Sequence, residues 1–205
     1  MTKKIYFLKI FVLFIILFNH HSSIAQTSRM SGGKLTFIPN KTNEGLIFGS
    51  VTFPNKKALY NSYSFIFRYK NADDRTTRKN STSFTIRPKQ LFKVEHGGEL
   101  DEGLTYLFAF KLPEGEYELS RISFHANGGM MGIGFNFIDP IDKIQIKSVK
   151  GEINYVGNIV FDEYFLNNED VIKHRDHFEK DLEAIKKEQL YIYWQAAKNN
   201  FIPVQ

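Results

Sequence analysis

Between residues 34 and 165, hydrophobic positions recur in short runs that turn-forming residues separate. In residues 63–69, four aromatic residues alternate with smaller or polar ones. Side chains alternate sides along a strand, so this pattern predicts a β-strand with its aromatic face in a core. Further strands are predicted at residues 34–38, 46–53, 82–87, 104–112, 116–124, 143–149 and 152–161. Eight or nine short strands at this spacing predict an all-β fold, an antiparallel β-sandwich.

Three segments add detail to this pattern. Residues 70–80 are polar and predict a loop, whereas residues 104–112 are apolar at odd and even positions, as expected of a central strand covered on both faces. In residues 117–124 the apolar positions change from odd (Tyr117 and Leu119) to even (Ile122 and Phe124). A regular strand would send these pairs to opposite faces, so we predict a β-bulge at residues 120–121 with Arg121 in solvent.

The pattern changes after residue 165. The chain contains no Gly or Pro from there to Pro203, and Val171, Phe178, Leu182 and Ile185 recur at helical spacing. We predict a helix within residues 170–199. A straight helix of that length would extend about 45 Å, so we expect a break near residues 188–191. These boundaries give a β-sandwich domain at residues 26–165 and a helical tail at residues 166–205 that packs on it.

Residues 1–25 have the organisation of a secretory signal peptide. Lys3 and Lys4 precede an apolar run at residues 10–18, and small residues at Ser23 and Ala25 precede a cleavage site at Gln26. The apolar run is shorter than the roughly 20 residues that a membrane-spanning helix needs. We therefore expect export, a mature chain that begins at Gln26, and no integral membrane span after cleavage.

Composition limits the partners and the location. The net charge of +5 falls to +2 when the three lysines of the leader are removed (5 − 3), which gives no reason to expect nucleic acid or an anionic membrane surface as a partner. The chain has no Cys, which excludes a lipid-modified Cys, thiolate metal ligands and a cysteine nucleophile. Its 20 Phe and 10 Tyr can supply a core without disulfides. Small secreted eukaryotic domains are usually rich in disulfides, so we expect a bacterial protein of the periplasm, the outer surface or the medium.

Two stretches resemble the prealbumin-like β-sandwich family, which includes the carboxypeptidase regulatory-like domains. The stretch GLIFGSV (residues 45–51) is similar to the family's first strand. The stretches DEG (residues 101–103) and LPEGEYEL (residues 112–119) are similar to its signature loop and to the approach to its last strand. The resemblance covers residues 45–125, although the two stretches lie further apart than in the family and strands continue past Phe124. It implies the sandwich fold and a non-catalytic role.

The densest set of ionisable residues is Glu95, His96, Glu99 and Asp101. Carboxylates near an imidazole could carry out acid–base hydrolysis of a glycan. However, these residues lie in a Gly-rich segment between predicted strands, where a solvated hairpin loop is the simpler interpretation. An envelope glycan hydrolase therefore stays open as the alternative function.

Two other features could form a contact surface. The loop GGMMGIG (residues 128–134) carries Met130 and Met131, and with Phe135 these could provide an adaptable recognition surface. Trp194 in the aromatic tail could stack on a sugar or on a protein partner. Docking of the tail onto the sandwich would also explain Trp194, because a short amphipathic helix needs tertiary burial.

A metal site would need His174, His177 and Asp181 to converge on the predicted helix. Helical zinc motifs place two His four residues apart, whereas these two are three apart, and His174 shares the apolar face. The chain also has no Gly-x-Ser-x-Gly nucleophile motif. We expect no catalytic residue, no metal ion and no other cofactor.

These features predict an exported, non-catalytic β-sandwich protein that binds or supports a partner at the bacterial cell envelope. The partner would be an envelope protein or a glycan.

Overall fold

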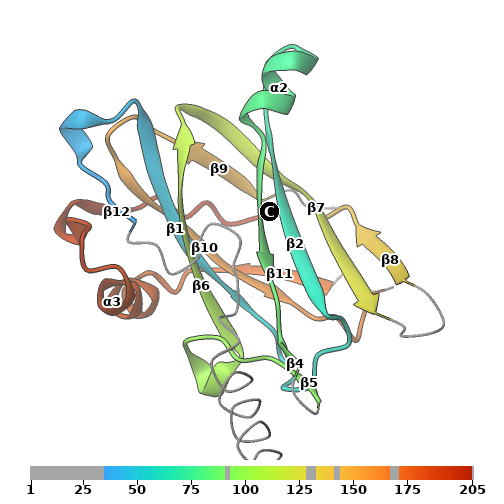
Figure 1. Cartoon of the computed structure of the whole chain (residues 1–205). Coiled ribbons are helices and arrows are strands. Elements are labelled where there is room, and N and C mark those ends of the chain that lie inside the picture. The colour runs from blue at the N-terminus through green and yellow to red at the C-terminus, as the bar shows by residue number, and fades with distance from the viewer. Residues whose placement is uncertain (1–34, 91–92, 128–132, 141–143, 167–170, 205) are drawn as a thin grey trace, which may run out of the picture.

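The computed structural model describes residues 35–90, 93–127, 133–140, 144–166 and 171–204. This part of the chain is β-rich, with two five-stranded sheets and one two-stranded sheet (Figure 1). The predicted cleavage site at Gln26, and Met130 and Met131 of the predicted contact loop, lie outside the described residues.

The first sheet has the strand order β11 (Ile172–Arg175), β10 (Ile153–Phe161), β1 (Glu44–Thr52) and β6 (Thr105–Pro113), and β12 (Ala197–Asn199) also pairs with β10. The second sheet has the order β3 (Thr82–Ile86), β2 (Ser62–Tyr69), β7 (Gly115–Asn127) and β8 (Ile133–Ile138), and β9 (Gln145–Ser148) also pairs with β7. The short strands β4 (Lys89–Gln90) and β5 (Val94–Glu95) pair with each other. The helices of the described residues are α2 (Asp74–Asn80) and α3 (Phe178–Glu188), with 3₁₀ turns at Pro39–Lys41, Asp101–Gly103 and Trp194–Ala196.

One hydrophobic cluster joins the two large sheets. It contains buried side chains of β1, β6 and β10 together with those of β2, β3 and β7. Phe84 of β3 stacks on Phe108 of β6 with 4.7 Å between ring centroids, and Phe67 of β2 lies 5.9 Å from Phe110 of β6. Each buried aromatic side chain removes a large apolar area from water, so this cluster is the main source of stability in a chain without disulfides.

A second cluster covers the opposite face of the first sheet. Phe48 of β1 is buried there, with the Trp194 and Tyr155 rings at centroid distances of 5.1 and 5.2 Å. Leu182 and Ile185 of α3 belong to the same cluster. Figure 1 accordingly shows α3 beside β1, β6 and β10, away from the second sheet.

Two predictions about strand faces are confirmed. Tyr63, Phe65 and Phe67 of β2 are fully buried, and Tyr69 is half-buried against the same core. The aromatic stripe therefore faces inward, as its alternation indicates.

The predicted bulge is also confirmed. Ile66 pairs with Arg121 and the next residue, Phe67, pairs with Leu119, so Ser120 is the extra residue of β7. The apolar residues on both sides of the bulge are buried, at positions 117, 119, 122 and 124. Arg121 lies outside, where its guanidinium binds Asp139 with Nε 2.7 Å from Oδ1.

Other predictions need correction. The first sheet is mixed, because β10 pairs in parallel with β1 and with β12. Residues 104–112 do form a strand buried on both faces, but β6 is the last strand in the order of its sheet and not a central one.

The predicted loop at residues 70–80 also needs correction. This polar segment contains the helix α2, which begins after Asp73 because that carboxylate accepts the backbone N–H groups of Arg75 and Thr76. In Figure 1 this helix projects beyond the sheets.

The tail is less helical than its periodicity indicates. Helix α3 covers only residues 178–188, and it ends where the break was expected. Residues 172–175 and 197–199 instead extend the first sheet as β11 and β12. In the described part of the chain, no helix combines the length and the apolarity that a membrane crossing requires.

Candidate functional site: a buried histidine–glutamate pair

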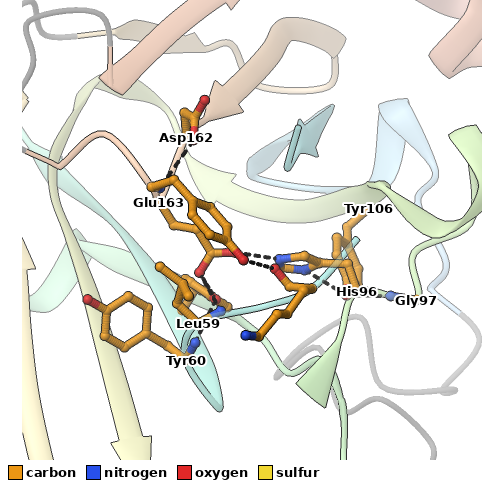
Figure 2. Close-up of polar contacts among 10 residues, drawn as sticks. Leu59, Tyr60, His96, Gly97, Tyr106, Asp162 and Glu163 are labelled. Atoms are coloured by element: carbon orange, nitrogen blue, oxygen red, sulfur yellow. Dashed lines mark hydrogen bonds and ion pairs between the residues drawn. The ribbon is translucent and has the colours of Figure 1, made fainter. Parts of the chain in front are cut away.

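A histidine and a glutamate meet inside the protein, at the end of the first sheet. His96 follows β5, and Glu163 follows β10. His96 Nε2 lies 2.9 Å from Glu163 Oε1, and the side chains are 0% and 1% exposed. Figure 2 shows the two side chains facing each other, with Tyr106 of β6 beside the histidine. His96 comes before β6 in the sequence and Glu163 comes well after it, so two distant segments of the chain meet in one polar contact.

The second carboxylate oxygen of Glu163 is also occupied. Oε2 accepts the backbone N–H of Leu59 at 2.8 Å and a short hydrogen bond from the Tyr63 hydroxyl. The Tyr63 hydroxyl in turn accepts the N–H of Tyr60 at 3.0 Å. Burial and the nearby Glu163 raise the pKa of Tyr63, so its hydroxyl keeps the proton that it donates. Glu163 therefore ties the turn before β2 to the end of β10.

Aromatic rings enclose the histidine. The His96 ring stacks on Phe53 with 3.9 Å between centroids. Its Nδ1 lies 3.4 Å from the Tyr106 hydroxyl oxygen, which accepts the N–H of Gly97 at 2.8 Å. Burial raises the pKa of Tyr106 to about 12. Both ring nitrogens of His96 thus face groups of the protein itself.

The loop after His96 can approach the sheet because it is rich in glycine. A Cβ atom on Gly98 would lie 2.2 Å from the carbonyl oxygen of Thr105, so only glycine fits there without a shift of the backbone. Asp101 and Glu102 then adopt left-handed φ angles of 53° and 56°, which turns the chain back into β6. The expectation of a solvated loop is therefore wrong for His96, which this close packing places in the interior.

The candidate hydrolase residues Glu95, His96, Glu99 and Asp101 lie in different local environments. Glu95 is on β5, where it pairs with Lys89 of β4. A Glu99 carboxylate oxygen accepts the N–H of Leu107 at 2.9 Å. Asp101 accepts the Thr105 hydroxyl at 2.7 Å and forms an ion pair with Lys180 of α3, whose hydrogen bond lowers the pKa of Asp101. His96 instead binds Glu163, which sequence analysis missed, because the two residues are 67 positions apart.

The two histidines of the candidate metal set lie on different elements. His174 is on β11, where its Nε2 lies 2.7 Å from the carbonyl oxygen of Val156. Burial lowers the pKa of His174, because desolvation disfavours the charged ring. His177 precedes α3, and its backbone N–H donates to the Tyr155 hydroxyl at 3.0 Å. Within the described residues, no three His, Cys, Asp or Glu side chains gather as a metal site.

Asp181 forms a second buried polar cluster, between α3 and the first sheet. Its Oδ2 accepts the hydroxyls of Ser50 at 2.6 Å and Tyr155 at 2.8 Å. Ser50 also accepts Nδ2 of Asn158 at 2.7 Å. Burial raises the pKa of Asp181, an effect that the hydrogen bonds from Ser50 and Tyr155 partly offset. The cluster anchors α3 to the sheet by polar contacts beside the apolar ones.

Of the predicted contact residues, only the Trp194 side chain lies in the described part. It is buried against Phe48, and its Nε1–H donates to the carbonyl of Gln189 at 2.8 Å. Trp194 therefore docks the tail onto the rest of the protein, which the sequence analysis left open as the alternative to binding of a partner by Trp194. The side chain of Phe135, like Met130 and Met131, falls outside the description.

Comparison with known proteins gives no functional assignment. No family model matches the chain, and no curated protein matches it. Among solved structures, the chain is similar to a leucine-rich repeat protein from Bacteroides thetaiotaomicron, with a TM-score of 0.32 and 12% sequence identity. That similarity covers 72% of this chain and 16% of the other, and at this TM-score it carries no argument.

Proposed function

We propose that this chain is an exported, non-catalytic β-sandwich protein of the prealbumin-like type, with a binding or structural role at the bacterial cell envelope. One observation carries the non-catalytic part of this proposal. His96 and Glu163 are buried, and their polar side-chain atoms contact groups of the protein. General acid–base catalysis needs a group within hydrogen-bond reach of the substrate, whereas this pair holds three segments of the chain together.

Two observations support the β-sandwich fold in this proposal: the hydrophobic core that the two large sheets share, and one turn. Side chains of both large sheets meet in one cluster, as in a two-layer sandwich. The turn between Pro113 and Gly115 leads into β7, where Tyr117 and Leu119 are buried. This is the arrangement that the LPEGEYEL motif implies.

The hydrolase alternative has less support. A glycosidase needs two carboxyl groups about 5–10 Å apart that face the same sugar. Glu99 contacts the backbone of β6, and Asp101 contacts Thr105 and Lys180. Both carboxylates therefore stabilise the loop and its contact with α3.

A fractionation experiment tests this proposal. The full precursor is expressed in a bacterial host, and the envelope, periplasmic and medium fractions are examined by mass spectrometry. We expect an exported chain beginning at Gln26, retained by purified envelope, and no release of sugar from that envelope. The double variant Glu99→Gln/Asp101→Asn serves as the matched control, and its purified form should behave like the wild type. Sugar release that this variant loses would establish the hydrolase instead, and a cytoplasmic full-length chain would overturn export.

A further inference from the structure

The strand β8 is the last strand in the order of the second sheet. Among the described residues it pairs with β7 alone, from Ile138 opposite Ile122 to Ile133 opposite Asn127. In an antiparallel pair only every other residue of a strand bonds to its neighbour, so the remaining N–H and C=O groups of β8 point away from β7. Figure 1 shows β8 at the outer edge of the sheet, on the right of the view. Such an edge is a template for a further strand.

Most of β8 lies beyond the core that the two large sheets share. Asn136 is opposite the buried Phe124 of β7, yet it is exposed, as is Gly134. A Cβ atom on Gly134 would meet nothing within 4 Å. Phe137 is 60% exposed, and Ile138 at the end of the strand is the described side chain of β8 that packs against the first cluster. The strand is therefore held mainly by β7, and a neighbour on its open edge would bury it further.

The composition of β8 differs from that of the other strands at the sheet edges. In the described part of the two large sheets, β3, β6, β9, β11 and β12 also pair along one edge only. All of these except β3 contain basic residues, which are Lys111, Lys147, Lys173, Arg175 and Lys198. The uncharged β3 carries the hydroxyl residues Thr82, Ser83 and Thr85. Charged residues, lysine above all, keep edge strands from pairing with other chains. The sequence of β8, IGFNFI, has no charged and no hydroxyl residue, so this edge is the one that favours pairing.

The lack of charge in β8 favours a second copy of the chain as its partner. A two-fold axis brings a strand against itself, and like charges that face each other across a strand pair are destabilising. The charged residue directly after β8 is Asp139, whose carboxylate is bound within its own molecule by Nε and Nη2 of Arg121 at 2.7 and 3.0 Å. Two copies of β8 can therefore meet without opposing like charges, and both open edges gain hydrogen bonds at once.

We propose that β8 pairs antiparallel with β8 of a second copy about a two-fold axis, so that the second sheets of two molecules form one continuous sheet. The six residues of β8 make a short interface, and short interfaces belong to the weak, transient class. The dimer therefore depends on concentration. This self-association goes beyond the proposed envelope role and does not rest on it.

Sedimentation velocity of the purified mature chain, residues 26–205, tests the inference from about 1 μM to about 500 μM, where a weak interface is partly occupied. We expect a reversible equilibrium of monomer and dimer. Phe137→Lys places a positive charge on the open edge of both copies, so the dissociation constant of the dimer should rise at least about fivefold. Phe137→Glu should have the same effect. An equal mixture of the two variants should recover the dimer, because opposite charges then face each other.

The matched control is Leu190→Lys, which makes the same charge change at an apolar residue that is 74% exposed and follows α3. It should dimerise like the wild type. Because Phe137 is largely exposed, both variants at this position should unfold at the wild-type temperature.

A wild type that stays monomeric over the whole range, or a dimer that Phe137→Lys retains, would overturn the inference. A dimer that only Leu190→Lys loses would also overturn it, in favour of the surface that follows α3. A monomeric wild type that purified envelope retains through Phe137 would identify a strand of another protein as the occupant, against a second copy. Export is measured separately by fractionation, so each of these results leaves it standing.

Discussion

At the scale of single residues, the environment of His96 shows how a polar pair can stabilise an aromatic core. Removing an imidazole and a carboxylate from water is costly unless every polar atom finds a partner. Glu163 meets this condition with bonds from His96, Leu59 and Tyr63. The pair therefore fixes where two loops meet the end of β10, a position that apolar packing alone would define less precisely.

His96→Ala should destabilise the fold strongly. It leaves Glu163 buried without its histidine, and breaking a buried pair by removing one partner costs about 3–5 kcal/mol. Urea unfolding followed by tryptophan fluorescence measures this change. The control is Arg121→Ala, which breaks an ion pair that is half-exposed on both sides, so its midpoint should hardly move. A His96→Ala midpoint equal to that of the wild type would show that the pair contributes nothing net.

Sequence reading succeeds at residues whose neighbours determine their environment and fails where a distant partner does. The alternation around Phe65 is enough to predict its burial, because a strand sends alternate side chains to one face. His96 has polar neighbours and two glycines after it, which favour a loop. Its burial depends on Phe53 and Glu163, and these contacts form only after the sheets have assembled.

At the scale of elements, the bulge in β7 keeps one face of the strand apolar. Ser120 adds one residue, so that Leu119 and Ile122 both face the core although they are three positions apart. A regular strand that contained the same residues, without the bulge, would turn Ile122 and Phe124 to the opposite face.

Deletion of Ser120 should therefore leave a folded protein in which β7 is regular. The apolar residues at positions 117, 119, 122 and 124 would still alternate with polar ones and face the core, and Arg121 would stay in solvent. An alanine inserted after Ser120 should instead abolish folding, because Ile122 and Phe124 would face solvent and Arg121 would enter the core, where an unpaired charge costs several kcal/mol. Circular dichroism and urea unfolding test both expectations. Ser120→Ala is the control, because it keeps the residue count and loses only the hydroxyl bond to the Ile66 carbonyl, worth about 1 kcal/mol. An unfolded deletion variant, or an insertion variant as stable as Ser120→Ala, would contradict this role of the bulge.

The docking of α3 should depend on pH through Asp181. Burial raises the pKa of Asp181 above its ordinary value of 3.8, so the folded state keeps this proton to a higher pH than the unfolded chain does. The carboxyl's contribution to stability is then greatest below the unfolded pKa, and it is lost as the pH rises through the folded pKa.

Asp181→Asn removes this titration and keeps an oxygen for Ser50 and Tyr155. As the pH rises from about 4, we expect the wild type to lose unfolding free energy relative to the variant. Urea midpoints measured from pH 4 to pH 8 provide the comparison, with Glu179→Gln on the exposed face of α3 as the control. Parallel curves for the wild type and Asp181→Asn would rule out the proposed linkage.

The tail shows why periodicity alone misplaces an element. Phe178, Leu182 and Ile185 form a true helical face, and Val171 matches the same spacing by coincidence. Residues 172–175 pair with residues 158–161 of β10, which lie 11 to 17 positions earlier, and this pairing decides their conformation. Short segments beside an open strand edge adopt the structure of the sheet when pairing outweighs helix propensity.

At the scale of the whole molecule, the first sheet is covered on both faces. One face packs on the second sheet through the first cluster, and the other packs on α3 and the residues around Trp194. The parallel pairings of β10 with β1 and β12 bring an early strand and the end of the chain into the same sheet. The sequence predicts the long strands of the first core, but it gives eight or nine strands where the described residues form twelve, and residues 34–38 are not one of them. The short strands β11 and β12 and this second cover depend on contacts far apart in the chain.

This double cover makes the boundary at residue 165 testable. A mature chain that ends at residue 166 would lose α3, β11, β12 and Trp194, and Phe48, Leu107 and Tyr155 would then face water. Each buried side chain of this size contributes about 1.5–3 kcal/mol relative to exposure, so the loss summed over these three, about 4.5–9 kcal/mol, is comparable with the whole stability of a small domain, about 5–15 kcal/mol. We expect the truncated chain to be unfolded or aggregated by circular dichroism and size-exclusion chromatography. Leu182→Ala and Ile185→Ala in the full chain provide graded controls, each folded and less stable by about 2–5 kcal/mol. Cooperative unfolding of the truncated chain would show that residues 26–165 form an autonomous domain and that the tail is an accessory to it.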